Sequence, residues 1–230
     1  MNETMPAEGT PHSGGVRYTG GRPVTFEKED VDGETFLQIL DESLEAMEAA
    51  EVPYVFIGSI PSVLLGRPRW TDAAEDIDYF VKREDARRAL DALEEAGFAT
   101  QETNTQWLYK GKKDGVVVDV IFRSTGDIYL NDEMLERAPV GEFKGRKVRL
   151  APPEDLLVMK AIAHGQDTQT YWYDALGILA KGDLDWDYLF TRAMQHGARR
   201  ICSLLIYGDS NDLVVPAGVI QRFVTAIYTE

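Results

Sequence analysis

The pattern of hydrophobic and polar positions along the chain changes near residue 152. Before that point, short apolar stretches typical of buried strands alternate with stretches whose apolar residues recur at helical spacing. The expected strands cover residues 54–58, 76–81, 105–111, 115–122 and 142–151, and the expected helices cover residues 33–50, 61–65 and 84–98. This order of elements predicts an α+β fold with a mixed sheet and helices on one face.

Beyond Pro152-Pro153 the pattern is helical as far as residue 230. Gly, Pro or Asp residues separate amphipathic stretches that cover residues 152–165, 170–182, 186–197, 198–208 and 216–230. We therefore expect a mixed part at 33–151 and a helical part at 152–230. The helical part is either a bundle of its own or a layer packed on the mixed part, and the sequence leaves both open. Residues 1–32, rich in Gly, Pro and polar residues, predict a flexible tail.

Composition and charge narrow the classes of function. The net charge of −15 disfavours sequence-independent binding of nucleic acid, because that affinity comes from Lys and Arg on phosphates. No apolar run reaches the roughly 18 residues of a membrane span, and the N-terminus lacks the features of a signal peptide. We therefore expect a cytoplasmic protein with no membrane partner. The single cysteine, Cys202, excludes an internal disulfide and a cysteine-based zinc site.

Three aspartates interrupt strands that are otherwise apolar. Asp76 and Asp78 stand two residues apart, so a strand would point both carboxylates to one side, roughly 6.5 to 7 Å apart along the chain. Asp119 lies within "GVVVDVIF", and it would join them if the two strands are neighbours. A divalent cation would remove the cost of burying such charges, and oxygen ligands suit Mg2+ or Mn2+. Capping of a strand end or a salt bridge to a nearby Arg is the alternative.

Gly58-Ser59 stands where a strand leads into a helix. Glycine lets a phosphate approach the backbone, serine offers a hydroxyl, and a following helix presents free N–H groups. The same pair is also an ordinary helix N-cap, and the sequence leaves both interpretations open.

These residues together resemble the nucleotidyltransferase superfamily of DNA polymerase beta. The pattern there is Gly-Ser or Gly-Gly, then Asp-x-Asp, then one Asp on a later strand, and it is matched here between residues 54 and 123. The resemblance implies a catalytic domain at 33–151 and transfer of a nucleoside monophosphate from a nucleoside triphosphate to a hydroxyl. It implies that Asp76 and Asp78 bind two Mg2+ (or Mn2+) ions, that Asp119 binds the catalytic one and helps activate the acceptor, and that Gly58 and Ser59 hold the triphosphate.

The resemblance extends, with departures, to further residues around the nucleotide. Lys160 is the candidate to neutralise the triphosphate, the alternative being a solvated helix lysine. Asp174 is placed in the nucleotide-binding region, although the basic residues that many relatives carry before it are replaced by "TQTYWY". Arg67 and Arg69 lie on an unusually long loop and either clamp phosphate or pair with nearby carboxylates.

The acceptor stays open at this stage. Small members of the superfamily modify antibiotics, and others act on RNA or protein within toxin-antitoxin pairs, which would add a partner protein. Two basic clusters, one at 110–113 and one at 144–149, either form a patch for an RNA acceptor or are solvated hairpin turns. The acidic chain favours a cationic small molecule by electrostatic attraction. The alternative function is a catalytically silent protein that binds a nucleotide or a partner on the same fold.

Overall fold

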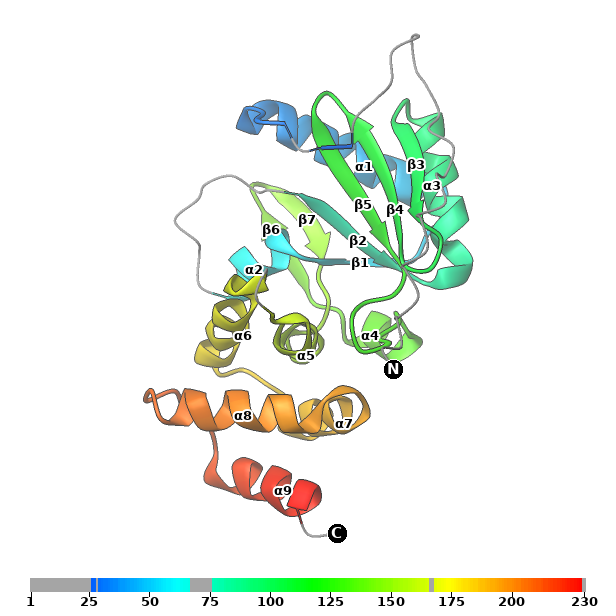
Figure 1. Ribbon diagram of the computed structural model, residues 1–230. Coiled ribbons are helices and arrows are strands. Elements are labelled where there is room, and N and C mark those ends of the chain that lie inside the picture. Colours follow the sequence, from blue (N-terminus) through cyan, green and yellow to red (C-terminus); the bar gives the residue numbers. More distant parts are fainter. Residues whose placement is uncertain (1–25, 28, 67–75, 166–167, 229–230) are drawn as a thin grey trace, which may run out of the picture.

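The computed structural model describes residues 26–27, 29–66, 76–165 and 168–228. Five strands form one mixed sheet in the order β1-β2-β5-β4-β3 (Figure 1). They are β1 Tyr54–Ile57, β2 Ile77–Val81, β3 Ala99–Asn104, β4 Leu108–Lys113 and β5 Val116–Ile121. The pair β2/β5 is parallel and the other pairs are antiparallel, so the predicted α+β fold with a mixed sheet is confirmed.

Helices α1 (Gly33–Ala49) and α3 (Ala86–Glu95) cover one face of this sheet (Figure 1). Their apolar positions share a buried cluster with alternate residues of the central strands, including Ile77, Tyr79 and Val118. Asp32 caps the start of α1 by accepting hydrogen bonds from the backbone N–H groups of Glu34 and Thr35. This is the face that the sequence pattern predicted to carry helices.

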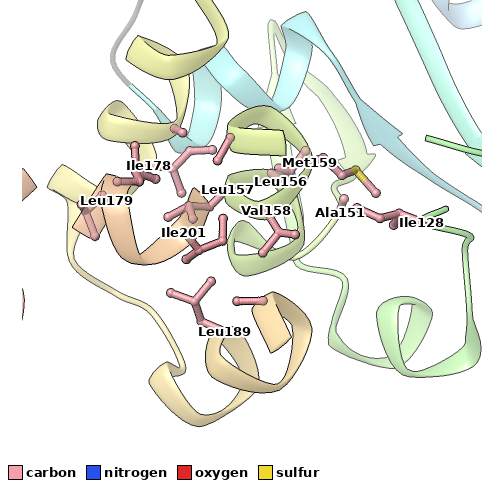
Figure 2. Packing of buried hydrophobic residues seen from close by; sticks show 14 of the residues in the cluster. Ile128, Ala151, Leu156, Leu157, Val158, Met159, Ile178, Leu179, Leu189 and Ile201 are labelled. Carbon is pink, nitrogen blue, oxygen red and sulfur yellow. The ribbon is translucent and has the colours of Figure 1, made fainter. Parts of the chain in front are cut away.

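The C-terminal helices lie beyond the opposite face of β1 and β2. They are α5 Pro153–Ala163, α6 Thr170–Lys181, α7 Trp186–His196, α8 Ala198–Asp209 and α9 Ala217–Tyr228. Helix α5 lies nearest the sheet, α6, α7 and α8 pack against α5, and α9 packs against α8 (Figure 1). Val55, Ile57 and Phe80 of the sheet belong to the same buried cluster as apolar residues of all five helices. Figure 2 shows part of this cluster around α5, with Leu157, Ile178 and Leu189 pointing into it. The helical part is therefore packed on the mixed part, on the face opposite α1 and α3, so the sheet carries helices on both faces and not on one as expected.

The remaining elements are short. A 3-10 turn, η1 (Arg83–Asp85), precedes α3, and α2 (Ser59–Leu65) follows β1 directly. The hairpin of β6 (Val140–Phe143) and β7 (Arg146–Arg149) is joined to β1 by a hydrogen bond from the Ala151 N–H to the Phe56 carbonyl. Among the helices that the structure describes, none combines the length and the apolar composition needed to cross a membrane.

The single strand expected at 142–151 was wrong, because a turn at Lys144-Gly145 divides this segment between β6 and β7. Two further elements were absent from the sequence prediction. Strand β3, "ATQETN", lies at the edge of the sheet and is polar and exposed over its second half. Helix α4 (Asp132–Arg137) has six residues and one buried side chain, Met134. Both carry too few apolar residues to show a hydrophobic period.

Candidate active site

A cavity of about 730 Å3 opens between the sheet, α5 and the β5–α4 loop. Six of the residues predicted from the sequence line it together: Gly58, Ser59, Asp76, Asp78, Asp119 and Lys160. Asp174 lies behind the lining and forms an ion pair with Lys160. Arg67 and Arg69 lie outside the described residues, so their predicted role is not tested.

One row of paired residues crosses the sheet beneath this cavity. Ile57 of β1 pairs with Asp78 of β2, Asp78 pairs with Asp119 of β5, and Asp119 pairs with Lys110 of β4. Residues paired in this way point to the same face of a sheet. The strands that carry Asp78 and Asp119 are therefore neighbours in register, and Asp76 lies directly before β2.

The electrostatics of this row are unfavourable for negative charge. Burial, followed by the charges of Asp119 and Asp76, raises the pKa of Asp78 to about 7, although Lys160 and Lys110 act in the opposite direction. Burial also raises the pKa of Asp119, against the lowering effect of its hydrogen bond with Lys110. Burial and mutual repulsion both disfavour the charged form of these carboxylates, so a bound cation would stabilise the site.

Gly58 makes room for the Asp78 carboxylate. The glycine has φ of +75°, and a Cβ placed on it would lie 1.9 Å from Asp78 Oδ2. Only glycine satisfies both the left-handed backbone and this contact. Ser59 Oγ donates to the Asp76 carbonyl at 3.0 Å, so in this structure the hydroxyl fixes the start of β2. Gly58 thus leaves room for the Asp78 carboxylate, and Ser59 fixes the backbone at Asp76.

Lys160 reaches the cavity from α5 and is 8% exposed. Its Nζ lies 3.1 Å from Asp174 Oδ2 on α6 and 4.3 Å from the centre of the Tyr171 ring. The alternative of a solvated lysine is therefore wrong. A buried ammonium at the mouth of the α5–α6 pair is well placed to meet an anionic ligand.

Lys110 is a site residue that sequence reasoning missed. Its Nζ lies 2.7 Å from Asp119 Oδ1, inside the row of site residues. The sequence interpretation grouped it with Lys112 and Lys113 as one basic cluster. Lys112 instead pairs with Glu29, and Lys113 pairs with Glu42 of α1. Only the register of β4 against β5 could have separated Lys110 from its neighbours, and that register is not visible in a single sequence.

The wall of the cavity beyond Asp119 was also not predicted. It carries Trp107, which is 40% exposed, and the β5–α4 loop, where Arg123 pairs with Asp127. Thr168, just before α6, and Tyr171, in the first turn of α6, also line it. No pattern in the sequence marked these loop residues, because their role depends on which loops meet over the sheet.

The donor set of this site suits a divalent cation, since Asp76, Asp78 and Asp119 supply carboxylate oxygens to one cavity. Asp119 already has the Lys110 ammonium as a partner. Within the described residues, no group of three or more His, Cys, Asp or Glu side chains stands close enough together to hold a metal ion. Among the described residues, the three carboxylates therefore do not form one ready coordination shell.

A mixed sheet with paired acidic strands, a Gly-Ser turn and a helical layer around one cavity defines a nucleotidyltransferase. The chain belongs to the family described as "uncharacterised nucleotidyltransferase", whose model matches residues 27–207. A search of curated proteins found no match.

Solved structures of several nucleotidyltransferases are similar to this chain at low identity. The antibiotic-resistance factor ANT(2'')-Ia is 16% identical, with a TM-score of 0.44 over 78% of this chain and 94% of its own. The lincosamide antibiotic adenylyltransferase LnuA, bound to lincomycin, is 16% identical, with a TM-score of 0.45 over 65% of this chain and 99% of its own. An antigenic nucleotidyltransferase-like protein from Paracoccidioides brasiliensis is 14% identical, with a TM-score of 0.45 over 83% and 96%.

Proposed function

We propose that this nucleotidyltransferase moves a nucleoside monophosphate from a nucleoside triphosphate to an acceptor hydroxyl, with Mg2+ or Mn2+ as cofactor. The observation that carries the proposal is the partly buried Asp78 carboxylate, which lies against Gly58 and lines one cavity together with Asp76 and Asp119. A protein that only stabilised its fold would gain by replacing such charges. In a nucleotide-binding site, these carboxylates would bind the cation that accompanies the phosphates.

Asp76 and Asp78 would hold the ion. When bound, a divalent cation neutralises these carboxylates and withdraws charge from the phosphate oxygens of the nucleotide. Lys160 would hold the β- and γ-phosphates, because its buried ammonium borders the cavity next to Gly58 and Ser59. Asp174 and the Tyr171 ring keep that ammonium in place. Arg67 and Arg69 stay candidates for a further phosphate contact.

Asp119 would receive the acceptor on the other side of the cavity. In the transfer, the acceptor oxygen forms a bond to the α-phosphorus, and the bond from that phosphorus to the bridging oxygen breaks. Pyrophosphate leaves with the electron pair, and the hydroxyl proton passes to the Asp119 carboxylate. Trp107 and the Arg123–Asp127 pair border this side and would contact the body of the acceptor.

A small-molecule acceptor is favoured over RNA. The cavity has the volume of a small-ligand pocket, and that volume must also take the nucleotide. Lys112, Lys113 and Arg146, from the two basic clusters, are each paired with a carboxylate of the chain. Those charges are already balanced within the protein, so they contribute less to an RNA patch. The acidic chain adds a preference for a cationic acceptor.

The test is transfer of label from each nucleoside triphosphate, labelled at the α-phosphate, in the presence of Mg2+. Cationic small molecules with hydroxyl groups, RNA and candidate partner proteins serve as acceptors, and release of pyrophosphate is measured in parallel. We expect transfer by the native chain and its loss in Asp78→Asn. Asp91→Asn, on the exposed face of α3, is the matched control and should be unchanged.

Two outcomes would contradict the proposal. Nucleotide binding without transfer to any acceptor class would favour the catalytically silent alternative. Full activity of Asp78→Asn would place the reaction elsewhere in the chain.

A further inference from the structure

Lys110 occupies an unexpected place for a lysine in a site of carboxylates. It lies in the middle of β4, directly opposite Asp119 of β5, and its side chain points to the cavity face of the sheet. Its Nζ lies 2.7 Å from Asp119 Oδ1, and the two side chains are 20% and 16% exposed. An ion pair this close and this well covered has a fixed geometry, unlike the exposed pairs at the protein surface.

This contact conflicts with a second metal ion at Asp119. The ammonium already donates to one oxygen, Oδ1, of the carboxylate that would coordinate the ion, and two cations that share one carboxylate repel each other. Asp78 differs, because within the described part of the chain no ammonium or guanidinium lies at ion-pair distance from it, and Lys160 and Lys110 act on it only at longer range. The row of site residues therefore needs a cation at Asp78 and already has one at Asp119.

We propose that Lys110 supplies the positive charge on the acceptor side of the site, so that transfer uses one divalent ion, held by Asp76 and Asp78, together with this ammonium. The inference rests on the proposed function and specifies how its site is charged. Lys110 acts through Asp119 as a positioning residue. It holds the carboxylate toward the acceptor hydroxyl and stays protonated while the new oxygen–phosphorus bond forms, the bridging bond breaks and the hydroxyl proton passes to Asp119.

The direct test is a count of bound ions in the native chain. Mn2+ is titrated into the protein saturated with a nucleoside triphosphate analogue whose α,β-bridging oxygen is replaced by methylene, and bound Mn2+ is measured by electron paramagnetic resonance. Ions held at the distal phosphates alone are subtracted with Asp78→Asn, which keeps Lys160 and the other phosphate contacts. We expect one Asp78-dependent ion per chain. Two Asp78-dependent ions would overturn the inference.

Variants at Lys110 provide the second readout. Lys110→Met should lower kcat by about 100-fold, the size of effect seen when one preorganised charge-stabilising group is removed, with little change in KM for the nucleotide. It should also gain a second Mn2+, because Asp119 loses its ammonium. Lys110→Arg, which keeps the charge, should retain one ion and most of kcat. A Lys110→Met variant with unchanged kcat and one ion would overturn the inference.

Lys113→Met is the matched control. Lys113 lies on the same strand with similar exposure, 27%, but pairs with Glu42 of α1 on the opposite face of the sheet. Its ion count and kcat should equal those of the native chain. If Lys110→Met fails to fold, the ion counts of the native chain and of Lys110→Arg still distinguish one bound ion from two. A native chain that binds neither Mn2+ nor nucleotide would overturn the proposed function as well, whereas two ions with normal transfer would overturn this inference alone.

Discussion

At the scale of single residues, the site depends on a contact between a glycine and a carboxylate. Asp78 Oδ2 occupies the space that a side chain at position 58 would need, and the left-handed backbone of Gly58 brings the strand end this close. The sequence showed Gly58 and Asp78 as separate parts of a motif. In the structure, the missing side chain of Gly58 leaves the space that the Asp78 carboxylate occupies. Position 58 is therefore sensitive to the smallest substitution.

Gly58→Ala should therefore be costly. Left-handed strain and the clash with Asp78 together predict a loss of about 2 to 4 kcal/mol of unfolding free energy and a large loss of transfer activity. Gly145→Ala is the matched control, because Gly145 also has a positive φ, +85°, but its Cβ would meet nothing within 4 Å. The control should lose only the strain of about 1 to 2 kcal/mol. Equal losses in urea unfolding would show that Asp78 does not press against position 58.

Asp78 should also make the ion-free protein less stable as the pH rises. Its pKa is about 7 in the folded chain against 3.8 for an ordinary aspartate, so between these values the folded state binds more protons than the unfolded state. The penalty is absent below pH 4, grows as the pH rises through 7, and reaches at most about 4 kcal/mol. Asp78→Asn lacks it and should be more stable than the native chain at pH 8, with a smaller advantage at pH 5.

The measurement is urea unfolding of both proteins at pH 5 to 8 without divalent ions, and then with Mg2+. The advantage of Asp78→Asn should shrink when Mg2+ is added, since the ion stabilises only the carboxylate. Asp91→Asn controls for the removal of a surface charge. A difference between native and variant that stays constant with pH would contradict the assignment of a partly buried, repelled carboxylate to Asp78.

At the scale of elements, α5 must be held firmly because it carries Lys160 into the cavity. A buried network fixes it to α7: Asp155 Oδ1 accepts from Arg192 Nε at 2.6 Å, and Asp155 Oδ2 accepts from the Tyr188 hydroxyl at 2.7 Å. Asp155 and Arg192 are almost fully buried. Each of the two charges has the other as its ion-pair partner, so each depends on the other.

Arg192→Met should leave Asp155 buried without its partner and cost about 3 to 5 kcal/mol of unfolding free energy. The double variant Asp155→Leu, Arg192→Met removes both charges and should recover a large part of that loss. Arg222→Met is the control, because its pair with Asp187 is exposed, 46% and 87%, and such pairs contribute about 1 kcal/mol or less. A double variant no more stable than Arg192→Met would show that the two charges do not compensate each other.

The elements also show what the sequence could reveal. Long periodic helices and apolar strands were predicted within a few residues, because burial on one or both faces leaves a hydrophobic pattern. Edge strand β3 and the short helix α4 left none. At the site, the spacing of Asp76 and Asp78 indicated a shared face, but the ion pair between Lys110 and Asp119 depends on strand register. Register arises from the packing of distant segments and has no local signature.

At the scale of the whole molecule, the cavity has two walls that belong to one hydrophobic core. Val55, Ile57 and Phe80 of the sheet share a buried cluster with residues from α5 through α9. The sheet wall supplies the carboxylates and the α5 wall supplies Lys160. Any loosening between the two would separate the ion site from the phosphate contact, so activity requires the helical layer to stay docked.

Because one buried cluster joins the sheet to all five C-terminal helices, we expect the chain to unfold in a single cooperative transition. A fragment of residues 26–151 would expose Val55, Ile57 and Phe80 to water, lose the burial that they share with the helices, and fail to unfold cooperatively. Calorimetry and near-ultraviolet circular dichroism of the full chain and the fragment provide the measurement. A nucleoside triphosphate with Mg2+ should raise the transition temperature of the full chain as one unit. Two separate transitions, with only one shifted by nucleotide, would show instead that the sheet and the helical region are independent domains.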